Sequence, residues 1–151
     1  MPNLQKTNFE EICKTLLSGN IFPENINARY VAEDEAKEFV TDPTLLKRIL
    51  SNLINNAVQA MPNGGALEIQ ARRESGEVVI TVKDTGVGIS EEYKDKMFTP
   101  LFTTKAKGQG FGLAVVKRMT EALGGTATFE SEVGKGAKFI LRLPDSQKLQ
   151  C

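Results

Sequence analysis

The strongest constraint on how this chain folds lies between residues 42 and 61, where apolar side chains recur at helical spacing. Asp42 is expected to be the N-cap of a helix and Pro43 its first residue, and Pro62-Asn-Gly-Gly65 follows as a stop signal. The apolar arc of this helix comprises Leu46, Ile49, Leu50, Leu53, Ile54, Ala57, Val58 and Met61. Because the arc is broad, the helix is expected to bury it against the rest of the molecule.

The rest of the chain supplies strands and shorter helices. Helical spacing also marks residues 9–17 and 111–123, each followed by glycine. Ser90 is expected to cap a short helix that runs to Met97. Strands are predicted at 26–31, 39–40, 67–72, 78–83, 126–130 and 138–143. The pattern predicts an α/β two-layer sandwich, in which one mixed, mostly antiparallel sheet is covered on one face by about three helices.

Composition excludes several classes of function. The chain has 151 residues, enough for one domain with a substantial core. Its 19 basic and 19 acidic residues cancel, which argues against nucleic-acid binding driven by bulk charge. Cys13 and Cys151 are the only cysteines and histidine is absent, so neither a disulfide framework nor a Cys/His zinc site is expected. Without a long apolar run or a signal peptide, we expect a cytoplasmic domain that makes no membrane contact of its own.

One side of the 42–61 helix carries amide side chains. Spacings of three, four and seven residues share a helical face, and this face holds Asn52, Asn55, Asn56 and Gln59. Asparagine is a mediocre helix former, and charged residues would cost less on a plain solvent face. Amide oxygens, however, can join the coordination shell of a hard cation beside waters and phosphates. The stripe is therefore either a solvated surface or part of a metal and phosphate site.

A second motif, Asp84-Thr-Gly-Val-Gly88, follows directly after the apolar strand predicted at 78–83. A carboxylate at a strand end can accept a hydrogen bond from an exocyclic amine, and the glycines Gly86 and Gly88 let backbone approach a flat ring closely. The alternative is an ordinary strand-to-turn transition, in which Asp and Gly take their usual turn positions. Taken alone, the motif fits this alternative better.

A third motif, Thr103-Thr-Lys-Ala-Lys-Gly-Gln-Gly-Phe-Gly112, opens the helix predicted at 111–123. Its glycines expose backbone N–H groups, while the helix N-terminus, Lys105 and Lys107 add positive charge. This is the chemistry of a phosphate site, although the glycine spacing matches neither a Walker loop nor Gly-x-Gly-x-x-Gly. The alternative is a flexible surface loop. Residues 99–110 lack periodicity and are expected to be mobile.

In this order and spacing, the motifs resemble those of the gyrase, heat-shock-chaperone, histidine-kinase and mismatch-repair ATPase superfamily. The corresponding boxes are Asn52-Leu-Ile-Asn-Asn-Ala57 (N box), Asp84-Thr-Gly-Val-Gly88 (G1), residues 98–105 (F), Gly108-Gln-Gly-Phe-Gly112-Leu (G2) and Gly134-Lys-Gly136 (a further glycine box). The likeness covers most of the chain, from about Asn25 to Leu143. It implies a Bergerat-type fold in which ATP and Mg²⁺ lie under a lid between the F and G2 boxes.

The resemblance also implies roles for individual residues. Asn56 would ligate Mg²⁺ and Asn52 would support the phosphate and metal site, and together with Lys105 they form the expected catalytic set. Asp84 would bind the adenine amine. Further nucleotide contacts are expected from Gly86, Gly88, Phe98, Thr104, Gly108, Gly110, Gly112 and Leu113. The chain departs from the family at Ala137, where threonine is frequent, so one minor polar contact with the nucleotide is in doubt.

Within the superfamily, the chain is most similar to the catalytic domain of two-component sensor histidine kinases. The sequences Asn56-Ala-Val-Gln-Ala-Met61 and Thr103-Thr-Lys105 resemble the nitrogen-regulatory type in particular. That class phosphorylates a histidine on a separate dimerisation and phosphoacceptor domain, with a response regulator as a further partner. The absence of histidine here is then explained, because the acceptor lies outside this chain. We interpret residues 1–20 as the helix that ends a linker from that domain, 21–144 as the ATP-binding domain and 145–151 as a frayed tail.

Two other mechanisms use the same motifs. A stand-alone serine/threonine kinase of the anti-sigma-factor type needs no histidine, and an ATPase switch of the gyrase or chaperone type hydrolyses ATP. Both generally place glutamate at the position of Asn52, as a base that activates a hydroxyl or water. An amide cannot accept that proton, and imidazole needs less help to attack. Asn52 therefore favours the histidine kinase.

Overall fold

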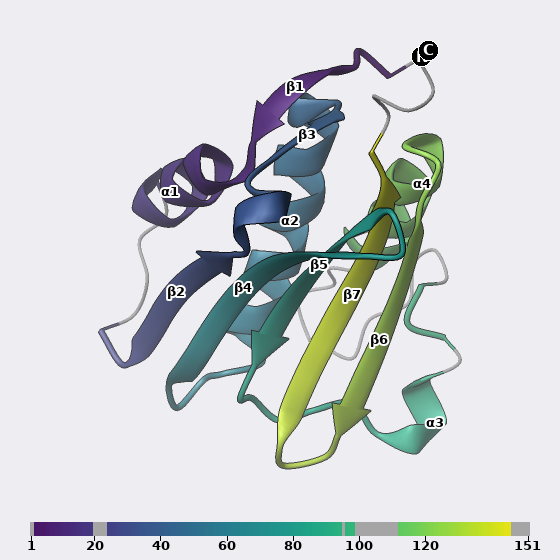
Figure 1. Cartoon of the computed structure of the whole chain (residues 1–151). Helices are drawn as coiled ribbons and strands as arrows, with labels where there is room; N and C mark the ends of the chain where they lie inside the picture. Colours follow the sequence, from purple (N-terminus) through teal and green to yellow (C-terminus); the bar gives the residue numbers. More distant parts are fainter. Residues whose placement is uncertain (1, 20–23, 95, 99–111, 146–151) are drawn as a thin grey trace.

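The structure, a computed structural model, describes residues 2–19, 24–94, 96–98 and 112–145. Its elements in chain order are β1 (Gln5–Asn8), α1 (Phe9–Gly19), β2 (Ile26–Ala32), a 3-10 helix (Asp34–Ala36), β3 (Glu38–Thr41), α2 (Pro43–Gln59), β4 (Gly65–Glu74), β5 (Glu77–Asp84), α3 (Glu91–Lys94), α4 (Gly112–Ala122), β6 (Thr126–Glu132) and β7 (Gly136–Pro144). Figure 1 shows their arrangement. None of the helices described is both long and apolar enough to cross a membrane.

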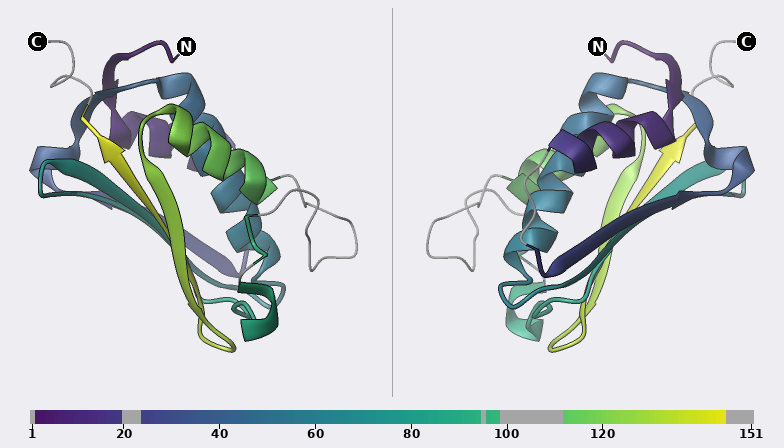
Figure 2. Two further views of the ribbon diagram at one scale, coloured as in Figure 1. Left: turned by 90° about the vertical axis from the view of Figure 1, so that its right-hand side faces the viewer. Right: turned by 90° about the vertical axis from the view of Figure 1, so that its left-hand side faces the viewer.

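The main sheet has five strands in the order β2-β4-β5-β7-β6. Strands β2 and β4 run parallel, and the other neighbouring pairs are antiparallel. Helices α1, α2 and α4 lie on one side of this sheet, and no element in the described part of the chain covers the opposite side (Figure 2). The predicted two-layer sandwich with a mixed, mostly antiparallel sheet is confirmed.

Helix α2 is the central element of the helical layer. Asp42 caps it, because one carboxylate oxygen accepts hydrogen bonds from the backbone N–H groups of Thr44 and Leu45 at 3.0 and 3.1 Å. The buried residues of α2 are Leu46, Ile49, Leu50, Leu53, Ile54 and Ala57, as its apolar periodicity predicts. The helix ends at Gln59, slightly earlier than the predicted Met61, and Ala60 is its C-cap.

The N-terminal residues belong to the same core. Phe9, Ile12 and Cys13 of α1 are buried together with residues of α2 and the sheet. Strand β1 was not predicted, and it pairs antiparallel with β3 in a separate two-stranded sheet. Its sequence, Gln-Lys-Thr-Asn, lacks the apolar alternation that identifies a strand, and its backbone partner comes from a segment far away in sequence.

Two predictions at element ends are wrong. The helix expected from Ser90 to Met97 is a single turn, α3, and the Ser90 hydroxyl is buried with no hydrogen-bond partner in the part of the chain described. Asp145, expected in a frayed tail, is buried, accepts a hydrogen bond from the backbone N–H of Val40 at 3.2 Å and pairs with Arg73 at 2.7 Å. Residues 146–151 lie outside the described residues.

Cys13 provides a test of this core. Its side chain is fully buried, and burial, aided by the negative charge of Glu10, raises the pKa of the thiol from 9.0 to about 12. In the unfolded chain the thiol ionises at lower pH, so its contribution to stability is complete below pH 9 and is lost as the pH rises toward 12. We therefore expect the free energy of unfolding to fall above pH 9.

Denaturant titrations between pH 8 and 11 measure this dependence, and Cys13→Ala is the informative variant. The alanine variant is expected to be less stable near pH 8 because a buried sulfur is lost, but its free energy of unfolding should decline less steeply above pH 9. A slope equal to that of the parent chain would contradict the buried, neutral thiol. Both proteins carry Cys151→Ser, so that Cys13 is the only thiol that differs.

Candidate functional site

A cavity of about 250 Å³ lies where the C-terminal end of α2 meets the end of β5. Its described lining consists of Asn56, Gln59, Ala60, Pro62, Asp84, Val87, Gly88, Ile89, Met97, Ala137 and Phe139. The structure thus brings together three of the predicted nucleotide-binding residues, Asn56, Asp84 and Gly88, and also Gln59 of the amide stripe and Ala137. A mainly apolar wall with a few polar groups is the usual composition of a small-molecule site.

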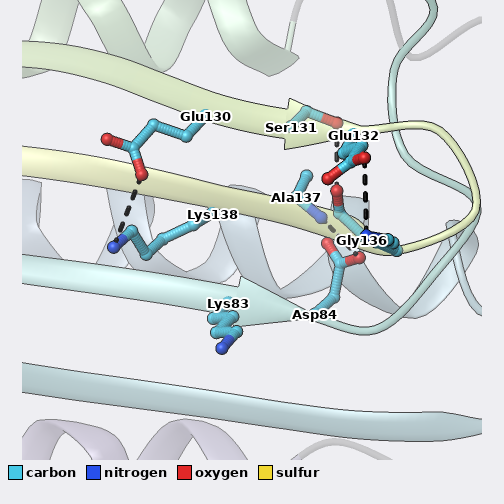
Figure 3. Close-up of a pocket in the computed structure, with 9 residues that line it drawn as sticks. Lys83, Asp84, Glu130, Ser131, Glu132, Gly136, Ala137 and Lys138 are labelled. Atoms are coloured by element: carbon cyan, nitrogen blue, oxygen red, sulfur yellow. Dashed lines mark hydrogen bonds and ion pairs between the residues drawn. The ribbon is translucent and has the colours of Figure 1, made fainter.

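Asp84 is the last residue of β5 and faces the helical layer, since side chains alternate along the strand and the preceding Lys83 is exposed. It is only 3% exposed. One of its carboxylate oxygens accepts hydrogen bonds from the backbone N–H groups of Gly86, at 2.8 Å, and Ala137, at 3.3 Å; Figure 3 shows Ala137 beside it. A carboxylate can accept several hydrogen bonds, so Asp84 is able to accept one from a ligand amine in the cavity.

The turn after β5 is held between α2 and the β6–β7 hairpin. The backbone N–H of Val87 donates to the carbonyl of Ala60 at 2.9 Å, and a Cβ added at Gly86 would lie less than 3.0 Å from that carbonyl oxygen. Gly88 has a φ of +77°, and a Cβ there would lie less than 3.0 Å from the carbonyl oxygen of Glu132. In the structure, these two glycines therefore allow the turn to lie close to the protein's own backbone, at Ala60 and at Glu132.

The amide stripe of α2 is divided between cavity and solvent. Asn56 is half-buried and lines the cavity, whereas Asn55 is exposed. Asn52, one turn earlier, is half-buried but does not line this cavity. Within the described residues, no group of three or more acidic or cysteine side chains could hold a metal ion by itself. Amide oxygens combined with phosphates and water suit a hard cation, so the residues present fit Mg²⁺ bound together with a phosphate ligand.

Other predicted contacts lie behind or beyond the cavity. Phe98 packs against Phe129 and Phe139, with ring centroids 5.8 and 6.3 Å apart, and so supports the wall that Phe139 forms. Leu113 is buried in α4, of which Gly112 is the first residue. The remaining predictions, Thr104, Lys105, Gly108, Gly110 and the mobile loop 99–110, fall outside the described residues.

Some lining residues were missed in the sequence. They are Ala60, Pro62, Val87, Ile89, Met97 and Phe139. Ala60 contributes a main-chain carbonyl, which no residue type reveals. Phe139 could have been found, because it alternates along the last strand to the same face as Ala137.

A larger hollow of about 360 Å³ lies where β5 and β6 end and β7 begins (Figure 3). It is shallow and polar, and its charged side chains include Lys83, Lys138 and Glu130, of which Lys138 and Glu130 pair at 3.6 Å. Such a surface offers little apolar contact to a flat ring. Asp84 lines both hollows, and the cavity between α2 and β5, with its mainly apolar wall, is therefore the candidate ligand site.

Known proteins share both the sequence and the fold. Residues 41–147 match the family model described as "Histidine kinase-, DNA gyrase B-, and HSP90-like ATPase". Sensor histidine kinase ZraS of Escherichia coli (strain K12) is 42% identical over 129 residues, which cover 85% of this chain and 28% of that protein. The catalytic domain of histidine kinase ThkA superposes with a TM-score of 0.83 at 29% identity, covering 95% of this chain and 96% of that chain.

A third comparison is with full-length ShkA, whose structure was solved in complex with AMPPNP. It also gives a TM-score of 0.83, at 25% identity, and covers 95% of this chain and 31% of that chain. The chain spans about 28% of the length of ZraS, so its likeness is to one domain of a longer protein. It belongs to the family of histidine kinase-, DNA gyrase B- and HSP90-like ATPases, as an ATP-binding domain of the sensor-histidine-kinase type.

Proposed function

We propose that this domain binds Mg-ATP with its adenine in the cavity beside Asp84, and positions the γ-phosphoryl group for transfer to a histidine on a separate domain. The observation that carries the proposal is the buried Asp84 carboxylate, held by two backbone N–H groups at a cavity that Asn56 also lines. Adenine presents an exocyclic amine and a flat apolar ring, which match this carboxylate and these walls. The AMPPNP complex of ShkA, which has the same fold, supports the assignment.

The metal and phosphate contacts follow from the N and G2 boxes. Asn56 would supply an amide oxygen to Mg²⁺, which when bound neutralises charge on the transferring phosphoryl group, and Asn52 would support the phosphates. Helix α4 begins at Gly112 and directs the positive end of its dipole toward its N-terminus, which suits a phosphate group. The other proposed contacts are Gly86, Gly88, Phe98, Thr104, Lys105, Gly108, Gly110 and Leu113.

The amide at position 52 favours a histidine acceptor. A serine or threonine hydroxyl must lose its proton as it attacks, and asparagine cannot take that proton. A neutral imidazole attacks through a lone pair, so positioning and electrostatic stabilisation are sufficient. ZraS and ThkA are both named histidine kinases, which favours this acceptor over the serine/threonine alternative.

The partners follow from the same chemistry. The chain contains no histidine, so the acceptor must lie on another domain, which we propose to be a dimerisation and phosphoacceptor domain. A response regulator is the proposed next acceptor. Since basic and acidic residues balance, we propose no nucleic-acid partner, and we place the domain in the cytoplasm without membrane contact of its own.

Transfer can be tested by mixing the chain with radiolabelled ATP, Mg²⁺ and a histidine-bearing helical-hairpin domain. We expect label on the hairpin domain that is lost in acid and retained in alkali, as phosphohistidine requires, and no label on this chain alone. The control is the same hairpin domain with its histidine replaced by glutamine. Acid-stable label would contradict the acceptor class, and nucleotide binding without any transfer to a cognate hairpin would contradict the catalytic role.

A further inference from the structure

We infer that Ser131 is a positioning residue for the adenine cavity, because its hydroxyl holds the turn that carries Gly88 and Ile89. The inference rests on the nucleotide site proposed above. Ser131 lies near the end of β6, where it is half-buried and opposite Ala137 of β7. It does not line the cavity itself, so its effect on a ligand must pass through the turn.

The hydroxyl of Ser131 both donates and accepts. Its oxygen accepts a hydrogen bond from the backbone N–H of Ile89 at 2.7 Å and donates to the carbonyl of Gly136 at 3.0 Å; Figure 3 shows the bond to Gly136. A hydroxyl has one proton, so donating it to Gly136 leaves the oxygen lone pairs for Ile89. One side-chain atom thereby joins the turn after β5 to the β6–β7 hairpin.

Backbone contacts hold the same turn at neighbouring points. The N–H of Gly134 donates to the carbonyl of Val87 at 2.9 Å, and Gly88 lies against the carbonyl of Glu132. On its other side, the turn is bonded to Ala60 of the α2 C-cap through the N–H of Val87. The turn therefore spans from α2 to the hairpin, and three of its residues form one wall of the cavity.

Among these contacts, the bond to Ile89 is the one that depends on a side chain, so substitution can remove it without changing the backbone. Without the Ser131 hydroxyl, the half-buried N–H of Ile89 loses its acceptor, and the wall formed by Val87, Gly88 and Ile89 is held less firmly. A ligand must then order this wall when it binds, which lowers its affinity.

The test compares three variants of the full chain by titration calorimetry with Mg-ADP and by amide hydrogen exchange. Ser131→Ala is expected to bind about tenfold more weakly and to exchange the Ile89 amide faster. Ser131→Thr keeps the hydroxyl on a strand that tolerates β-branching and should restore the affinity. Thr128→Ala removes a hydroxyl from the exposed face of the same strand and should bind like the parent.

Adenosine separates a defect at the ring from a defect at the phosphates. If Ser131 acts on the cavity wall formed by Val87, Gly88 and Ile89, Ser131→Ala should weaken the binding of adenosine by about the same factor as the binding of Mg-ADP. The inference is overturned if Ser131→Ala binds nucleotide as tightly as the parent, or if Thr128→Ala loses as much affinity as Ser131→Ala. It is also overturned if Ser131→Thr does not recover the affinity. In each case the proposed function stands. If the parent chain binds no nucleotide, the proposed function and this inference both fail.

Discussion

Replacing Asp84 with asparagine is expected to weaken binding of ATP and ADP by about 100-fold with the fold retained. The amide keeps one oxygen, which can still accept from the N–H groups of Gly86 and Ala137. The second carboxylate oxygen is replaced by an NH₂ group, which is a donor. This donor would face the adenine amine, which is also a donor, so no hydrogen bond could form between them. The site loses a charge-assisted hydrogen bond and gains two opposed donors in a buried position.

Titration calorimetry with Mg-ADP measures this loss, and Asp34→Asn is the matched control. Asp34 is an exposed acid of the 3-10 helix whose only described partner is Lys37, so its replacement removes the same charge far from the cavity. The parent chain should also prefer ATP to GTP, because guanine has a carbonyl where adenine has its amine. An equal loss in the control, or equal affinity for the two nucleotides, would contradict the role of Asp84.

Replacing Gly88 with alanine is expected to abolish binding, a loss on the order of 100-fold or more, and to lower the melting temperature of the domain. Two effects combine at this position. The positive φ of +77° disfavours a side chain, and the new Cβ would lie less than 3.0 Å from the Glu132 carbonyl. Both the new Cβ and the Glu132 carbonyl are fixed to the backbone, so the clash can be relieved only if the turn moves. That movement would displace one wall of the cavity.

Gly134→Ala separates the two effects. Gly134 has a φ of +82°, close to that of Gly88, but a Cβ there meets nothing within 4 Å among the described residues. Only the conformational cost remains, about 1–2 kcal/mol, and nucleotide affinity should change little. If Gly134→Ala loses as much affinity as Gly88→Ala, the clash with Glu132 is not the cause. Parent-like binding by Gly88→Ala would show that the tight turn is not needed.

Elements with strong local patterns were predictable. The cap at Asp42 and the apolar arc of α2 lie within one continuous segment, and so do the hairpin strands β4 and β5. Strand β1 was not predictable in this way, since its pairing with β3 is formed by residues distant in sequence. Asp145 was likewise placed in a frayed tail, because its bonds to Val40 and Arg73 arise only when three distant segments meet.

In the candidate site, too, some residues were predictable from the local sequence and others were not. Asn56, Asp84 and Gly88 were identified because amide, carboxylate and glycine are recognisable residue types at recognisable spacings, and the structure brings them to one cavity. The Ala60 carbonyl and the Ser131 hydroxyl were not identified. A carbonyl belongs to every residue, and a serine in a strand is ordinary until its partner is known.

The sequence by itself determined the family, most of the helices and strands, and the chemical groups available for ATP, because each depends on the type and local order of residues. Tertiary structure decided how those groups are held. The turn after β5 packs between the Ala60 carbonyl and the β6–β7 hairpin, so Gly86 and Gly88 are needed for contacts within the protein even when no ligand is bound. Such contacts depend on the packing of α2 against the sheet and on the register of β6 with β7, which short-range patterns do not encode.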